Sequence, residues 1–177
     1  MKIINKIETM IEKWVKPLPH LPIKTQKTIA DNLWWVVGIG IVISGIGLLI
    51  VFNTFLNGMS ALMGAPGYGF YLTYIYTGWW ASSIIVSMLA LIITLIIMVK
   101  AFNPLKAMHR KGWDLLFLSL LVMVVAKVIS FILNISISGL FRDLIFAFVG
   151  IVIGAYILFE IKSYFKVGKI AAVIEKK

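Results

Sequence analysis

The sequence predicts an all-α fold: an integral membrane four-helix bundle with an N-terminal amphipathic interfacial helix. Three observations predict it. The chain is 61% hydrophobic and only 14% charged, it contains four apolar runs long enough to cross a bilayer, and its first residues alternate apolar and charged side chains with helical spacing. Average soluble chains carry roughly 45–50% apolar and 25% charged residues, so lipid must solvate much of this surface. The 177 residues leave room for one domain.

Residues 1–16 form the predicted amphipathic helix. Lysines and glutamates occupy one face, and the other is apolar. The segment is too charged to cross a membrane, so we expect it to lie in the headgroup plane with Trp14 as an interfacial anchor. The alternative is that its apolar face packs into a groove of another protein. The apolar residues are Ile3, Ile4, Ile7, Met10, Ile11, Trp14 and Val15.

Residues 17–32 are a proline-rich linker followed by a helix start. Pro17, Pro19 and Pro22 end the first helix, because proline lacks the N–H group and clashes with the preceding turn. We expect a short, stiff, extended linker here. Thr25 or Thr28 is the predicted N-cap of the next helix.

The first predicted span covers residues 33–56, which carry no charge. Trp34 and Trp35 stand where an aromatic belt belongs. Small residues of this span let a neighbouring helix approach closely. They are Gly38, Gly40, Ser44, Gly45 and Gly47.

Residues 57–78 are also uncharged, but their glycines and Pro66 argue against a continuous helix. We predict an external hairpin or a partly re-entrant segment at the outer leaflet, whose backbone would need protein cover. The alternative is a longer, tilted second span that begins near Leu72.

The other predicted spans cover residues 79–99, 113–133 and 140–159, so the four-span domain extends over 33–165 and a basic tail over 166–177. Asn103-Pro104 predicts a turn in the loop between the second and third spans. Further interfacial anchors are Trp79, Trp80 and Trp113, and further helix-packing residues are Gly150 and Gly154.

The basic residues predict the orientation. Residues 1–32 carry six lysines, the 100–112 loop four Lys or Arg, and the chain from Lys162 onward five lysines, whereas 57–78 carry none. All three basic segments fall on one side of a four-span protein. By the positive-inside rule both termini are therefore cytoplasmic, in the cell (inner or plasma) membrane.

One charged residue interrupts a span. A charge at the centre of a span costs about 2.5–3.5 kcal/mol, so Lys127 needs an explanation. A functional reading makes it part of a polar path, and a structural reading has it snorkel toward a carboxylate nearer the surface. The candidate intramembrane cluster is Lys127, Ser130, Asn134 and Asp143. Asp114, Glu160 and Lys162 fall at the inner interface, where anchoring is the usual role of a charge.

The sequence shows no group of residues in a pattern typical of a catalytic or metal-binding site. The chain has no cysteine, no phosphate-binding or hydrolase motif, and two histidines, His20 and His109, without a second ligand at metal-binding spacing. We therefore predict no catalytic, cofactor or metal site. The net charge of +10 flanks apolar spans, so anionic lipid headgroups explain it better than nucleic acid.

The layout of proline-rich entry, four spans and the loop NPLKAMHRKGWDLL resembles small four-span membrane proteins of bacteria with reduced genomes. Some of those carry the label of chromate transporter. The leading hypothesis is a non-enzymatic protein that acts through helix packing, as a scaffold, an accessory subunit or a homo-oligomer. The alternative is a small transporter or channel with a polar path near Lys127 and Asp143 and a re-entrant 57–78 segment. A membrane enzyme is a distant third.

Overall fold

The structure, a computed structural model, describes residues 2–63, 70–133 and 137–165, with side chains for 6–60, 81–132 and 148–165. The described residues are α-helical except for short connections and one 3₁₀ turn, which confirms the all-α prediction. The elements are α1 (Lys2–Val15), α2 (Ile23–Met63), α3 (Phe70–Lys106), α4 (Arg110–Leu133), α5 (Ile137–Glu160) and the 3₁₀ helix η1 (Lys162–Tyr164).

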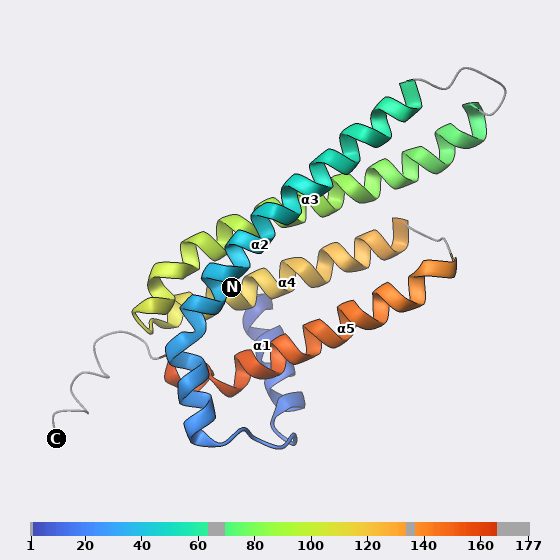
Figure 1. Cartoon of the computed structure of the whole chain (residues 1–177). Helices are drawn as coiled ribbons and strands as arrows, with labels where there is room; N and C mark the ends of the chain where they lie inside the picture. The colour runs from blue at the N-terminus through green and yellow to red at the C-terminus, as the bar shows by residue number, and fades with distance from the viewer. Residues whose placement is uncertain (1, 64–69, 134–136, 166–177) are drawn as a thin grey trace, which may run out of the picture.

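Four of the helices form two antiparallel pairs, α2 with α3 and α4 with α5, and α3 packs along α4 (Figure 1). α2 and α3 have 41 and 37 residues, and α4 and α5 have 24 each. The first pair therefore extends well beyond the second at one end (Figure 1). At the opposite end α1 lies across α5 and packs against it (Figure 1).

Three described helical segments are long and apolar enough to cross a membrane: Ile23–Ser60, Ala81–Lys106 and Arg110–Ile132. The chain is thus a multi-pass helical membrane protein. The predicted fourth span, 140–159, falls within α5, where the side chains are described only from residue 148 onward. That span stays a prediction.

The buried core lies at one end of the bundle. Its largest fully buried side chains are Trp113, Phe117, Leu105 and Ile161. The Trp113 and Phe117 rings stack with centroids 5.4 Å apart, and Phe159 meets both rings edge-on. Most other apolar side chains of α2, α3 and α4 are exposed or half-buried, as lipid-facing helices require.

The helices continue further into 57–78 than predicted. α2 runs through Gly58 to Met63, and α3 begins at Phe70, close to the alternative start near Leu72. The helix of the first span therefore ends later than the predicted residue 56, because α2 continues through Gly58. A helical glycine costs only about 1 kcal/mol relative to alanine, which the packing of α2 against α3 can offset. The rest of the segment, residues 64–69, lies outside the described residues.

Of the two helix boundaries around the linker, the predicted start of α2 needs correction. α2 begins at Ile23, directly after Pro22, so Thr25 and Thr28 do not cap it. The Thr28 hydroxyl instead donates to the Lys24 carbonyl, 2.9 Å away. α1 ends at Val15, as the prolines predict.

The predicted turn at Asn103-Pro104 is also wrong, because Pro104 lies inside α3. The chain turns at Met108, whose φ of 52° is left-handed. Gly112 lies in the first turn of α4, where a Cβ would stand 2.7 Å from the Leu105 backbone nitrogen. Only glycine allows α4 to begin so close to α3.

Candidate functional site

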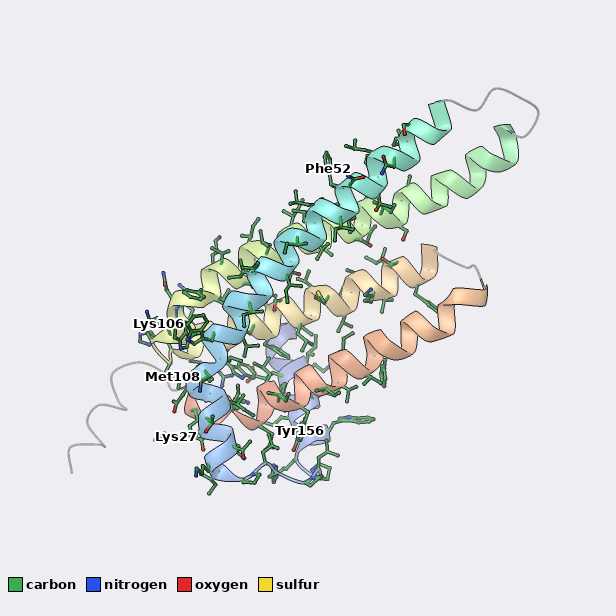
Figure 2. All side chains as sticks on the ribbon, in the orientation of Figure 1. Lys27, Phe52, Lys106, Met108 and Tyr156 are labelled. Atoms are coloured by element: carbon green, nitrogen blue, oxygen red, sulfur yellow. The ribbon has the colours of Figure 1, made fainter. Side chains whose placement is uncertain are left out.

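The charged contacts of the described residues gather where α1 and the linker meet the ends of α4 and α5. We call this region the polar end; it comprises residues 6–26, 106–114 and 156–165. Lys106 and Met108 lie at the same end of the bundle as Lys27, whereas Phe52 lies on the distant part of α2 (Figure 2).

A single carboxylate fastens the linker to α5. Glu160, the last residue of α5, is only 8% exposed, and its carboxylate accepts three hydrogen bonds. His20 Nδ1 donates to Oε1 at 2.6 Å, while the Leu21 N–H at 2.8 Å and Gln26 Nε2 at 3.0 Å donate to Oε2. A buried charge is tolerated only when it is paired and hydrogen-bonded, so Glu160 holds linker and helix together as one unit.

The same contacts set the protonation state of Glu160, which lies just beyond the predicted span 140–159. Burial would raise the pKa of this carboxyl, but the hydrogen bonds from His20, Leu21 and Gln26 together lower it below its ordinary value of 4.5. The carboxylate is therefore ionised at neutral pH. A proton on it would compete with the three donors.

Further bonds hold the linker nearby. The Tyr156 hydroxyl donates to the Pro19 carbonyl, and the Tyr164 hydroxyl donates to the Ile23 carbonyl at 3.3 Å. Gln26 Nε2 also donates to the Leu21 carbonyl at 2.9 Å. Side chains of α5 and η1 thus bind the backbone of the linker and of the α2 start, so the proline-rich segment follows the surface of the bundle.

A second set of charges fastens α1. The Glu8 carboxylate accepts from Arg110 Nη2 and pairs at 2.9 Å with Lys162 Nζ. Lys162 also bonds to Glu12, and Arg110 Nε donates to Asp114 at 2.9 Å. Helix α1, the start of α4 and the segment after α5 therefore meet at one carboxylate.

Glu8 responds to this environment in the same direction as Glu160. Partial burial would raise its pKa, but the hydrogen bonds and positive charges of Lys162 and Arg110 lower the pKa below 4.5. Its side chain is 17% exposed, so water screens the pair only in part.

An aromatic platform lies under the two cations. Trp113 is 0% exposed, and its indole N–H donates to the Leu158 carbonyl at 2.7 Å. The Arg110 guanidinium stands 4.2 Å from the Trp113 ring centroid, and Lys162 Nζ stands 5.7 Å from it and 5.6 Å from that of Phe159. These cation–π contacts fix both cations at the end of the bundle.

The apolar face of α1 divides into two stripes. Ile7, Ile11 and Val15 pack against the buried core, so this helix docks on its own bundle. Met10 and Trp14 stay exposed, at 54% and 77%. The alternative prediction, that α1 packs into a protein groove, therefore holds for the first stripe, which packs on this chain's own bundle. The second stripe, Met10 and Trp14, stays exposed.

Several residues of the polar end could not be assigned from the sequence. Asp114, Glu160 and Lys162 were expected to anchor at the interface, but they belong to the two charge clusters. His20 was expected to have no second metal ligand at metal-binding spacing, and the structure pairs it with Glu160, 140 positions away. The only local signal was that Glu160 follows a long apolar run, which makes a charge there either exposed or paired.

The predicted intramembrane cluster is not brought together by the described residues. Lys127 is exposed and forms no ion pair with a described side chain, and Ser130 on the same helix is half-buried. Asn134 and the Asp143 side chain lie outside the described residues. The Lys127–Asp143 pair therefore stays a prediction.

The predicted packing glycines differ from one another. A Cβ at Gly38 would lie 3.2 Å from the Phe102 ring, and one at Gly40 would lie 2.7 Å from Met98 Cε, so both lie at the α2–α3 contact. A Cβ at Gly154 would meet Leu120 at 3.8 Å. Gly45, Gly47 and Gly150 face open space, and Ser44 beside them is half-buried.

The predicted tryptophan anchors also divide. Trp113 is inside the core and cannot contact lipid, which corrects its assignment as an anchor. Trp35 is 58% exposed, and half-buried Trp34 lies 5.2 Å under Lys106 Nζ. The side chains of Trp79 and Trp80 lie outside the described residues.

The arrangement at the polar end fastens helices together and presents cations on aromatic rings. Within the described part of the chain, no group of three His, Asp or Glu side chains is placed to hold a metal ion. No family model, curated protein or solved structure matches the chain.

Proposed function

We propose that this membrane protein acts by helix packing, as a scaffold or accessory subunit or as a homo-oligomer, with four spans and both termini in the cytoplasm. The observation that carries the proposal is the open surface at Gly45, Gly47 and Gly150, where nothing lies within 4 Å of a built Cβ. A glycine within a helix destabilises it by about 0.5–1 kcal/mol relative to alanine. In a membrane protein, such a glycine allows a second helix to approach closely, and this packing can offset the loss.

The contrast with Gly38 and Gly40 supports this reading. Those two glycines are used inside the chain, where α3 side chains approach them closely. The open glycines lie on α2 and α5, on surfaces that no described helix of this chain covers. A second copy or a partner helix would use them in the same way.

The charge distribution supports the orientation. Arg110 and Lys162 contact α1 at the polar end, and Lys106 and Lys27 lie at the same end of the bundle (Figure 2). Placing this end in the cytoplasm satisfies the positive-inside rule. α5, with 24 residues antiparallel to α4, then supplies the fourth span and returns the chain to the same side.

The exposed stripe of α1 completes the proposed membrane contact. With Ile7 and Ile11 docked on the bundle, Met10 and Trp14 point elsewhere, and an indole suits the headgroup level. The anionic headgroups of the same bilayer are its proposed partner.

The test is the state of the protein in a mild detergent extract of its native membrane. We expect a particle larger than a monomer, resolved by native mass spectrometry into copies of this chain or a defined partner. Gly45→Leu combined with Gly150→Leu should shift it toward the monomer, and Ile43→Leu, an exposed control on α2, should not. A monomer with no co-purifying protein would exclude the proposal.

A further inference from the structure

We propose that Arg110 and Lys162 form a binding site for a phosphate group of the membrane surface, and that Glu8 of α1 occupies this site as an intramolecular stand-in. The inference is independent of the helix-packing function, because it concerns the polar end alone. It rests on how the two cations converge.

The two cations come from different parts of the chain but bind one oxygen. Arg110 is the first residue of α4 and Lys162 follows α5, yet both contact Glu8 Oε1. A lysine and an arginine focused on one carboxylate oxygen also suit a phosphate oxygen, since arginine binds carboxylate and phosphate with the same planar fork.

Both cations also contact an aromatic platform that does not belong to α1. Arg110 lies 4.2 Å from the ring centroid of the fully buried Trp113, and Lys162 contacts the Trp113 and Phe159 rings. These rings belong to α4 and α5, not to α1. The two cations therefore have partners on α4 and α5 that would remain beside them if α1 were released.

The local charge changes sign with α1. When α1 is docked, the carboxylates of Glu8, Glu12 and Asp114 surround the two cations. When α1 is released, only Asp114 remains beside them, and the site carries a net positive charge. Anion affinity is thus hidden while α1 is bound and appears when it leaves.

The location of Arg110 and Lys162 in the molecule indicates which kind of phosphate they would bind. Arg110 begins the membrane-spanning segment Arg110–Ile132, so the site lies at the membrane surface, the level of phospholipid phosphates. α1 carries Lys2, Lys6 and Lys13 against two glutamates, and Lys16 follows directly after it, so an anionic surface attracts the released segment as well.

The experiment measures binding of phosphatidylglycerol to the full chain in detergent by native mass spectrometry, with phosphatidylcholine as the reference lipid. Glu8→Gln should tighten phosphatidylglycerol binding about tenfold, the equivalent of about 1.4 kcal/mol. Glu12→Gln leaves Glu8 in place and should change binding far less. Unchanged helicity and elution volume establish that each variant is folded.

Second substitutions show which residues produce the tighter phosphatidylglycerol binding of Glu8→Gln. Adding Arg110→Gln or Lys162→Gln to Glu8→Gln should abolish it, whereas adding Lys111→Gln, the same charge change one residue along, should keep it. Equal affinity of Glu8→Gln and the unaltered chain, or an equal loss with Lys111→Gln, would overturn the proposal. Inorganic phosphate that displaces phosphatidylglycerol at a lower concentration than the lipid itself needs would overturn the assignment to the membrane surface and leave a site for soluble phosphate, whereas weaker or no competition would support the lipid.

Discussion

The polar end and the half of the two helix pairs that lies away from it, which we call the outer half, belong to the same helices but are stabilised by different means. At the polar end, the side chains of Trp113 and Ile161 are fully buried and a buried carboxylate has three donors. Along the outer half, side chains such as Ile43, Leu49 and Ile132 are more than half exposed. Protein packs the first region, and lipid must pack the second.

The chain determines its own packing at the polar end and depends on its surroundings elsewhere. The polar end fixes the positions of α1, the linker, the starts of α2 and α4 and the end of α5. In the outer half, the bilayer and neighbouring helices hold the helices in position. Substitutions at the polar end should therefore change folding free energy in detergent, and matched substitutions in the outer half should not.

The largest effect is expected from Trp113→Ala. The substitution removes a fully buried ring, its hydrogen bond to the Leu158 carbonyl and the platform for Arg110, so unfolding in detergent should become easier by about 3–5 kcal/mol. Trp35→Ala, at a 58% exposed position, is the control. Equal losses in the two variants would end the distinction between the regions.

Gly112→Ala tests the close start of α4. The new Cβ would stand 2.7 Å from the Leu105 backbone nitrogen, which cannot move alone, so we expect a loss of about 1–3 kcal/mol. At Gly40 the same 2.7 Å approach involves the flexible end of Met98, and Gly40→Ala should cost much less. Thermal unfolding of both variants in one detergent makes the comparison.

Glu160→Gln tests the carboxylate that holds the linker. The amide presents N–H groups to donors from His20, Leu21 or Gln26, so one or more bonds are lost, at about 1–3 kcal/mol. Glu12→Gln, at a 56% exposed carboxylate, is the matched control. A Glu160 variant as stable as this control would mean that the linker is held by other contacts.

Acid should loosen α1 and the linker before it unfolds the spans. The pKa values of Glu8 and Glu160 are lowered in the folded protein, so their contribution is present above the ordinary value of 4.5 and is lost as pH falls through the lowered values. Spin labels at Lys13→Cys and Ala107→Cys should separate in this range. Labels at Ala107→Cys and Ser163→Cys should not, and separation on raising the pH would contradict the assignment.

The smallest effect is expected from Lys127→Met in the outer half. Lys127 has no described ion-pair partner, and the apolar replacement has similar length, so the unfolding free energy should change by no more than about 0.5 kcal/mol. Lys127→Cys adds a second readout, since the chain has no other cysteine. Reaction with a membrane-impermeant thiol reagent would revive the polar-path hypothesis.

Local signals predicted the secondary structure well. Hydropathy runs predicted the three long apolar helices that are able to cross a membrane, the apolar spacing predicted α1, and three prolines predicted its end at Val15. The small residues Gly38 and Gly40 were correctly expected at a helix contact. Each of these properties depends on neighbours within a few turns of the chain.

The polar end was not predictable in the same way. The bond between His20 and Glu160 joins residues 140 apart, and that between Glu8 and Arg110 joins residues 102 apart. Neither is visible until the helices return to one end. Trp113 was misassigned because an interfacial tryptophan and a core tryptophan at the start of a span look alike in sequence.

The unequal lengths of the two helix pairs place a demand on the surrounding bilayer. α2 is uncharged from Leu33 to Met63, about 46 Å along its axis, whereas all of α5 measures about 36 Å. A hydrocarbon layer about 30 Å thick matches the second pair and falls short of the first. One chain thus offers its membrane two hydrophobic thicknesses. Lipid beside α2 and α3 must stretch, or that pair must lean, and thicker membranes should suit it better than thin ones.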